Sequence, residues 1–429
     1  MQGLDIETTA LDPEAGKVRL VQIRNGGRGR VYDGHDPELP AALRELDGGV
    51  AHNATFERSW IARHYGIDVG TLDDTMVMSQ VLYTGTNAAR AKQFSHSLQA
   101  VMKRELKREL PKDEQTSDWS AEELTPEQLH YAARDAHVLP DLAETLLAKI
   151  ERAGLRDVYE LERRVSYAVD AMQRNGFAIN EARLAPLVEE VTAEAERLKA
   201  ELEEEWGINP GSSKQLREYF GLEKREGWPT TQAGAPKTDQ DAMKALVEEE
   251  PSVAKWVEWK RVEKLRSTYG KSLQKEIVAG RIHARFNPFG AATGRFSSSG
   301  PNLQNIPKDE RLRSLFWSGS EDRVLIKADY SGIELWVAAI LWDDPHMQHA
   351  LQQGVNMHVA TAAALFNVKP GEVTKEQNSR THHERFPGLD RALKALLRYA
   401  EYPVLERGGP SSWISGFLRG QPAKVSKCK

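Results

Sequence analysis

A long polar segment, followed by a strand that ends in an aspartate, constrains this chain more than any other feature. The segment TGRFSSSGPNLQNIP occupies Thr293 to Pro307, and LIKADYSGIEL follows at Leu325 to Leu335. The apolar run Val324 to Ala328 predicts a short buried strand, which places Asp329 at its end. No ordinary folding requirement explains so long a polar run, because most connecting segments are much shorter. We therefore expect these residues to serve a function.

The composition indicates a globular protein with several domains. The chain has 429 residues, of which 40% are hydrophobic, enough for about two to four domains with buried cores. Its N-terminus lacks the pattern of a signal peptide, and no apolar run reaches the roughly 18 residues that span a bilayer, so we expect a cytoplasmic protein. The only cysteine is Cys428, which excludes an internal disulfide and a cysteine-based zinc site. Any metal must therefore be held by oxygen ligands.

The charge pattern restricts how the chain could bind nucleic acid. The net charge of -5 argues against a uniformly basic protein, because duplex binding depends on neutralising phosphates. Basic side chains gather instead in clusters interleaved with Glu, and a solvated helix face explains any one cluster about as well as binding does. The clusters are Lys103, Arg104, Lys107 and Arg108; Lys260, Arg261, Lys264, Arg266 and Lys271; and Lys308, Arg311 and Arg313.

The patterning along the chain changes three times. Residues 1–152 read as mixed α/β, with strands expected at Leu4–Thr8 and Lys17–Ile23. Residues 153–280 read as helical, with a strongly charged helix expected at Glu181–Trp206. Residues 281–377 return to mixed character, and residues 378–429 form an atypical basic tail. The fold class expected is therefore multidomain α/β and α.

Two carboxylates near the N-terminus form a candidate metal site. Asp5 and Glu7 are two residues apart on the expected strand, so both side chains leave the same face. Like charges this close are costly unless a cation joins them. Such a pair is by itself weak evidence, and a structural role is the commoner explanation. Tyr131 and Asp135 strengthen the evidence for a metal site, because they share one face of an expected helix at i and i+4. Glu57 lies between the two groups in sequence.

The order of these segments resembles a known family of nucleases. LDIETTALDP, HNATFE and YAARDAHVL resemble, in this order, the three motifs of DEDDy-type 3'-5' exonucleases. Phe94–Leu110 and Gln115–Trp119 also look like the proofreading domain of the DNA polymerase I group. The resemblance implies a ribonuclease H-like exonuclease domain in which Asp5, Glu7, Glu57 and Asp135 hold two Mg²⁺ ions, for which Mn²⁺ can substitute. These ions would lie about 4 Å apart, and Tyr131 would orient the attacking water.

Two features depart from that family. Its usual Asp is replaced by Glu57, whose extra methylene could move the carboxylate outward or make it act through water. The chain also begins only four residues before Asp5, so the first strand is short and an upstream start remains open.

The helical and C-terminal segments resemble family A DNA polymerases. Glu160–Asn180, SSKQLREYFG and WKRVEKLRSTY are similar to the thumb of these enzymes, which implies that Lys264, Arg266 and Lys271 contact phosphates. The Thr293–Pro307 segment is similar to the start of their palm. In it, Arg295 would check base pairing through acceptors common to all base pairs in the minor groove. Asn302, Gln304 and Asn305 would contact primer and template, although a turn-forming role is an equal alternative for each.

The strand that ends at Asp329 matches the first catalytic segment of the palm. The resemblance implies that Asp329 binds metal. It further implies that Tyr330, Glu334 and His358 contact the incoming nucleotide, with Glu334 crowding the sugar 2' position. Gly332 and Trp336 depart from the common motif DYSQIELR, and the Arg lost at position 336 puts local packing in doubt.

The resemblance ends near Gln377. The expected helix that grips the triphosphate and the later His-Asp-Glu turn with the second palm carboxylate are absent from the sequence. Residues 378–429 hold ten Lys or Arg against four Asp or Glu, which indicates a changed reading frame or, alternatively, a basic arm that binds nucleic acid. The palm is therefore expected to be incomplete.

These observations lead to one functional expectation and two alternatives. We expect a monomeric family A polymerase fragment that binds single-stranded 3' ends and primer-template DNA and keeps 3'-5' exonuclease activity. Templated synthesis needs both palm carboxylates, so it should be lost, and deoxynucleotide binding is doubtful. The alternatives are a non-catalytic DNA-binding remnant and an unstable product.

Overall fold

The computed structural model describes residues 1–46, 48–86, 94–109, 117–291, 294–330, 332–374, 377 and 424–428. It divides into two compact units. The first unit comprises Met1–Asp170, Pro288–Phe296 and Ile326–Lys429, and the second comprises Ala171–Asn287 and Ser297–Leu325. Several predictions fall partly outside the described residues. They include the proofreading-like segments at 94–119, single positions in the segments Thr293–Pro307 and Leu325–Leu335, and the basic tail, of which only Lys424–Cys428 is described.

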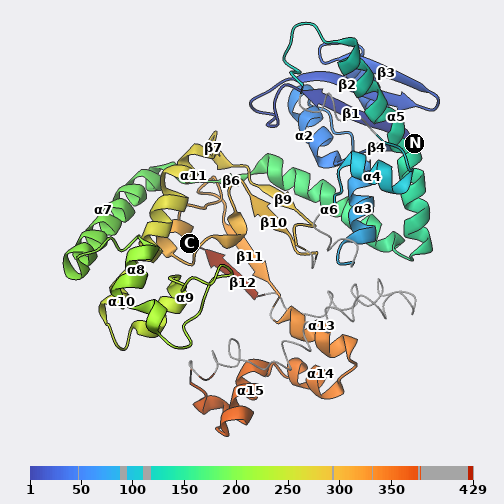
Figure 1. The fold of residues 1–429 in the computed structure, drawn as a ribbon. Helices are drawn as coiled ribbons and strands as arrows, with labels where there is room; N and C mark the ends of the chain where they lie inside the picture. The colour runs from blue at the N-terminus through green and yellow to red at the C-terminus, as the bar shows by residue number, and fades with distance from the viewer. Residues whose placement is uncertain are drawn as a thin grey trace. The chain divides into compact units, whose positions relative to one another are not determined.

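The first unit contains a sheet of five strands in the order β3-β2-β1-β4-β5 (Figure 1). The central strand β1 is antiparallel to β2 and parallel to β4. The strands are β1 Gln2–Thr8, β2 Val18–Asn25, β3 Arg28–Asp33, β4 Gly49–Ala51 and β5 Asp73–Asp74. The two strands expected from the alternating sequence pattern correspond to β1 and β2.

The described part of residues 1–175 contains six helices besides this sheet. Two of them place the candidate site. Helix α2 follows β4 directly, and α5 crosses the sheet and contacts β1, β2 and β3 (Figure 1). Helix α5 begins with Pro126 after a Thr125–Gln128 capping box, which satisfies free backbone N–H groups at its start. The helices are α1 Leu39–Arg44, α2 Ala54–Tyr65, α3 Thr75–Tyr83, α4 Leu98–Glu105, α5 Pro126–Arg152 and α6 Arg156–Asn175, of which α6 continues into the second unit.

The two faces of the sheet have different cores. Leu4 and Ile6 pack with Trp60 and Ile61 of α2 in one apolar cluster. On the other face, Leu20 packs against Ala132 of α5. Because side chains alternate along a strand, Asp5 and Glu7 lie on the face that α5 covers.

The second unit is built around a helical core. Helices α7, Glu181–Trp206, and α10, Ser252–Lys264, bury Trp206, Trp256 and Trp259 between them. Helix α10 continues through a π-helical turn, Leu265–Gly270, into α11, Lys271–Lys275. The remaining elements are β6 Phe177–Ala178, α8 Ser213–Tyr219, α9 Gln240–Met243, β7 Ile277–Val278, β8 Arg281–Ile282, β9 Arg285–Asn287, β10 Ser297–Ser299 and α12 Glu310–Arg313, with short 3-10 turns at Leu222–Lys224, Lys244–Leu246 and Leu303–Asn305.

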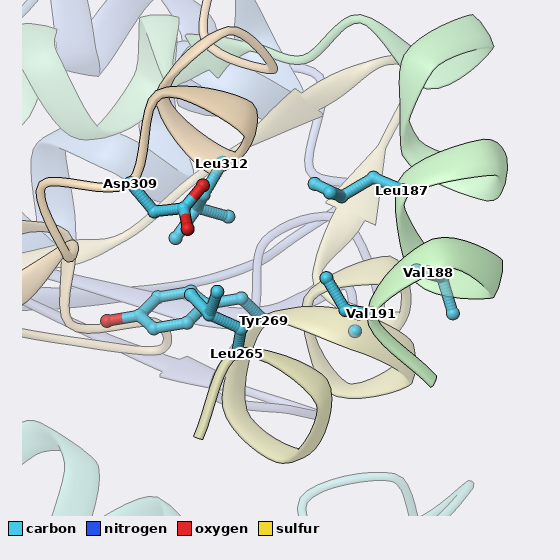
Figure 2. Close-up of a pocket in the computed structure, with 8 residues that line it drawn as sticks. Leu187, Val188, Val191, Leu265, Tyr269, Asp309 and Leu312 are labelled. Carbon is cyan, nitrogen blue, oxygen red and sulfur yellow. The ribbon is translucent and has the colours of Figure 1, made fainter. Parts of the chain in front are cut away.

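A small cavity lies beside the π-helical turn. Figure 2 shows Leu187, Val191, Leu265 and Tyr269 around it. Its volume is about 10 Å³, which leaves room for about one water molecule. It is therefore a packing defect rather than a ligand site.

The C-terminal elements of the first unit include one that differs from its prediction. Strand β11, Leu325–Asp329, is the strand expected at Val324–Ala328, but its residues are exposed or half-buried rather than buried. It pairs with β12, Lys424–Cys428, and no sheet of more strands includes it among the described residues. The helices that follow are α13 Ile333–Leu341, α14 Pro345–Gln352 and α15 Met357–Phe366, with a 3-10 turn at Pro370–Glu372. No helix in the described part of the chain is both long and apolar enough to cross a membrane.

Candidate active site

Strand β1 and helix α5 approach each other unusually closely beside Asp5. A Cβ atom added to Gly3 would lie 2.2 Å from the carbonyl oxygen of Ala136. No side chain fits in that space, so glycine allows the helix backbone to rest on the strand. Asp135 precedes Ala136, and the close approach therefore brings its carboxylate to the sheet face that carries Asp5.

Tyr131 and Asp135 share one face of α5 as predicted. The Tyr131 hydroxyl lies close enough to Asp135 that the two groups shift each other's pKa: Asp135 raises that of Tyr131, after burial as the larger cause, and Tyr131 lowers that of Asp135. Asp135 is buried, and the Arg134 Nε lies 3.7 Å from its Oδ1. The guanidinium of Arg134 also lies 5.2 Å from the centre of the Tyr131 ring. Tyr131, Arg134 and Asp135 thus form a connected group on one turn of helix.

Glu57 is in the first turn of α2, and a buried carboxylate holds that turn in place. The Asp74 carboxylate accepts hydrogen bonds from the backbone N–H groups of Asn53 and Ala54, at 3.0 and 2.8 Å. It also caps α3 by accepting from the N–H groups of Met76 and Val77. Sequence reasoning missed Asp74, although an Asp before the helical run at Thr75 is a recognisable N-cap signal.

A second buried group fixes the opposite side of α2. The Arg58 and Asp170 side chains are 3% and 0% exposed, with 3.9 Å between Nε and Oδ2. Ser59 donates to Asp170 at 2.6 Å, and Arg58 donates to Ser166 at 3.1 Å. These contacts join α2 to α6, so the helix that carries Glu57 is held from two sides.

The acidic side chains perturb one another's protonation. Burial raises the pKa of Asp5 well above its usual value, and the charge of Asp135 adds to this effect. Burial and the neighbouring Asp5 raise the pKa of Glu7 to about 9. Burial, followed by the charge of Asp5, also raises the pKa of Glu57. Burial raises the pKa of Asp135, which the nearby Tyr131 hydroxyl partly offsets. Asp5 is therefore within electrostatic reach of Glu7, Glu57 and Asp135.

The donor chemistry of this group fits a hard divalent cation. Carboxylate oxygens are the ligands that Mg²⁺ prefers, and a cation would favour the ionised form that burial, and for Asp5, Glu7 and Glu57 also a neighbouring charge, disfavours. Glu57 Oε2 and Asp135 Oδ1 are buried without a hydrogen-bond partner, a costly arrangement that a cation would relieve. Within the described residues, however, no three His, Cys, Asp or Glu side chains converge closely enough to form a metal cluster as they stand.

The predicted palm residues of the first unit are exposed, except His358, which is half-buried. Arg295 donates to Glu334 at 2.6 Å, in an ion pair whose side chains are 73% and 72% exposed. Asp329 ends β11 and is exposed, and Tyr330 follows it. His358 lies in the first turn of α15. Arg295 and Glu334, which are far apart in sequence, are thus brought together.

The predicted DNA-binding residues of the second unit have structural contacts of their own. The Asn302 Oδ1 accepts from the Gln304 N–H at 3.2 Å and caps the turn Leu303–Asn305. The Asn305 carbonyl accepts from the Tyr269 hydroxyl at 2.9 Å. The turn-forming alternative therefore applies at least to Asn302.

The three basic residues expected at phosphates lie between the end of α10 and the start of α11. Lys264 is exposed at the end of α10, and Lys271 begins α11. Arg266 forms a two-pronged ion pair with Glu263 at 2.8 and 2.6 Å, so a phosphate would have to compete with that carboxylate.

Comparison with known proteins matches both parts of the chain. Residues 3–151 match the 3'-5' exonuclease domain, and residues 181–387 match DNA polymerase family A, ten residues beyond the expected limit near Gln377. The sequence is 31% identical to DNA polymerase I of Aquifex aeolicus, over 93% of this chain and 70% of that protein. It is 33% identical to DNA polymerase I of Rhizobium leguminosarum, over 87% of this chain and 39% of that protein.

The structure also resembles a solved polymerase. The POL domain of Pol1 from M. smegmatis, in complex with DNA primer-template and dNTP, superposes with a TM-score of 0.75 at 26% sequence identity. The match covers 91% of this chain and 67% of that chain. Together with the identity to the Aquifex aeolicus enzyme, this shows that the chain belongs to the family A DNA polymerases and includes their 3'-5' exonuclease domain.

Proposed function

We propose that this chain removes nucleotides from the 3' end of a DNA strand in a reaction that depends on Mg²⁺. The observation that carries the proposal is the group of acidic side chains under α5, in which Asp5, Glu7 and Asp135 lie close enough for their charges to interact. A protein gains nothing in stability from burying like charges, whereas a nuclease needs such a set to hold its cations. The matched exonuclease domain supports the same reading.

The chain's own residues have distinct roles in this proposal. Asp5, Glu7, Glu57 and Asp135 would hold two divalent cations, Mg²⁺ or Mn²⁺. When bound, such cations lower the pKa of a water and stabilise the charge on the leaving oxygen. The Tyr131 hydroxyl, tied to Asp135, would orient the attacking water in line with the phosphorus. Glu57, one methylene longer than Asp, is the ligand whose position depends most on how α2 is held.

The remainder of the chain would bind DNA without copying it. We assign residues 153–280 to a thumb-like subdomain and 281–377 to a partial palm. Lys264, Arg266 and Lys271 would contact phosphates, and Arg295 with Asn302, Gln304 and Asn305 would contact primer and template. Tyr330, Glu334 and His358 would border a nucleotide site. Asp329 alone cannot hold two catalytic cations, so we propose that the chain with this sequence performs no templated synthesis.

A single assay tests the nuclease proposal. The protein is incubated with Mg²⁺ and a 5'-labelled single strand, and we expect the strand to shorten from its 3' end. Asp5→Ala is the control, because it deletes one ligand while relieving repulsion and should fold as well as the parent. Absence of shortening in a parent sample that melts cooperatively would reject the proposal.

The Glu at position 57, where the resembled family usually has Asp, supports a second candidate function. In this alternative, the chain is a remnant that binds DNA without catalysis. If the longer side chain misplaces the carboxylate, the protein should bind DNA in a salt-sensitive manner and not cleave it. Glu57→Asp separates the two candidates. Cleavage by this variant alone supports the remnant, and cleavage by the parent supports the nuclease.

A further inference from the structure

The buried side chain of Gln22 has an amide group without hydrogen-bond partners, at a position where an apolar side chain would also fit. Its side chain is 1% exposed, and neither Oε1 nor Nε2 has a hydrogen-bond partner. Leu20, two residues earlier on the same face of β2, is buried against Ala132 and Trp119. An apolar side chain would thus fit this face, and a buried amide without partners is costly.

Gln22 lies directly opposite Asp5. The two residues are Cα partners in the antiparallel pairing of β1 and β2, so their side chains leave the same face of the sheet and start about 5 Å apart at Cβ. That face is the one that α5 covers (Figure 1). The Gln22 side chain therefore lies in the layer between the sheet and α5, where it also lines a hollow of about 370 Å³ with His130 and Arg134.

The Gln22 amide can donate hydrogen bonds, which the acidic side chains cannot do when they are ionised. Asp5, Glu7, Glu57 and Asp135 offer only acceptors when ionised. Two buried oxygens, Glu57 Oε2 and Asp135 Oδ1, accept no hydrogen bond, although Asp135 Oδ1 has Arg134 Nε at 3.7 Å. A Gln side chain offers two N–H donors without adding charge. Hydrogen bonds from such groups orient metal-binding carboxylates.

We propose that Gln22 is a positioning residue that donates from Nε2 to the Asp5 carboxylate and fixes the orientation in which Asp5 binds a divalent cation. The inference rests on the proposed nuclease function. It extends the site to a residue on β2, and it accounts for an amide that destabilises the domain in the absence of its partner.

The test compares Gln22→Met with a matched control on the same strand. Met keeps the length of Gln and deletes both polar atoms. Ile23→Val removes one methylene from the neighbouring residue, which packs on the opposite face of the sheet. Both variants are measured as the full chain, by thermal unfolding in EDTA and by calorimetric titration with Mn²⁺. The rate of shortening of a labelled strand gives kcat and KM.

The proposal predicts that Gln22→Met has opposite effects on the melting temperature in EDTA and on the affinity for Mn²⁺. In EDTA, Gln22→Met should melt at or above the parent temperature, because an unsatisfied amide is gone. Its Mn²⁺ affinity and its kcat should fall about tenfold, as is usual when a partner of a metal ligand is removed, with KM for the strand unchanged. Ile23→Val should melt lower and bind Mn²⁺ as the parent does.

Two results would overturn the inference. One is a Gln22→Met variant that binds Mn²⁺ as tightly as the parent. The other is a variant that melts well below the parent in EDTA, which would mean that the amide has a structural partner. If the parent protein neither binds Mn²⁺ nor shortens the strand, the nuclease function itself is rejected. This outcome differs from the two results above, which concern only the Gln22→Met variant.

Discussion

The backbone of α5 contacts β1 at Gly3, where an added Cβ would lie 2.2 Å from the Ala136 carbonyl oxygen. The contact is one residue from Asp135 and two residues from Asp5. The distance between the candidate cation ligands Asp5 and Asp135 thus depends on Gly3, which has no side chain with which to bind a cation.

Gly3→Ala should therefore affect the nuclease more than the fold. The new methyl group must push α5 outward, which we expect to cost about 1–3 kcal/mol of unfolding free energy and to reduce nuclease activity by at least tenfold. Urea unfolding and the strand-shortening assay measure the two effects. Gly29→Ala in β3 is the control, because an added Cβ there meets no atom within 4 Å, and it should change neither property.

Asp74→Ala should loosen the turn that carries Glu57. The carboxylate is buried and accepts backbone hydrogen bonds at the starts of both α2 and α3, so its loss should cost about 2–3 kcal/mol and lower nuclease activity. Asp239→Ala provides the comparison, since Asp239 caps α9 in the second unit through Ala242 N–H at 2.9 Å. That variant should lose stability of about 1 kcal/mol and retain the nuclease. Equal nuclease activity in both variants would contradict a role for Asp74 in placing Glu57.

The stability of the protein in EDTA should fall as the pH rises. The pKa of Glu7 is raised from 4.5 to about 9 by burial and by Asp5, so the folded state holds a proton that the unfolded state releases. The stabilising effect is complete below about pH 4.5 and is lost as the pH passes through 9. Asp5 shifts in the same direction. Urea unfolding from pH 5 to 9 should show this decline, and Glu7→Gln should flatten it. A stability that rises over this range in EDTA would count against the raised pKa.

Breaking the Arg58–Asp170 pair should be costly, whereas replacing it should not. Both side chains are buried, so Asp170→Asn deprives the Arg58 charge of its main carboxylate partner and should lower the unfolding free energy by about 3–5 kcal/mol. The double variant Arg58→Met with Asp170→Leu should recover most of that loss, because a buried pair is often no better than apolar packing. The exposed pair of Arg63 and Glu14 is the reference, with 54% and 45% exposure. Glu14→Gln should leave the unfolding free energy close to that of the parent.

Releasing Arg295 from Glu334 should favour DNA binding. The pair is largely exposed and contributes at most about 1 kcal/mol, so Glu334→Gln should leave the melting temperature unchanged. If Arg295 contacts DNA, fluorescence anisotropy at low salt should show tighter primer-template binding by this variant. The gain should disappear in Glu334→Gln combined with Arg295→Ala. A gain that persists in the double variant would assign it to the lost negative charge alone.

The elements with strong local signals could be predicted from the sequence. The helix expected at Glu181–Trp206 corresponds to α7, and the alternating pattern around Asp5 predicted β1 and placed Asp5 and Glu7 on one face. The spacing of Tyr131 and Asp135 likewise placed them on one face of α5. Periodicity and capping residues lie within a few positions of one another, so they are readable without the fold.

The contacts that position these residues were decided by the tertiary structure. Gly3 contacts Ala136, and Gln22 lies opposite Asp5. Asp74 holds the turn before Glu57. No local sequence motif predicts any of these three contacts. The expected buried strand at Val324–Ala328 is exposed as β11, because burial depends on what other elements cover a strand. The sequence by itself therefore determined which acidic groups are available and which local elements carry them. Packing between distant segments determined how close these groups lie and how strongly their charges interact, since both depend on contacts that local sequence does not encode.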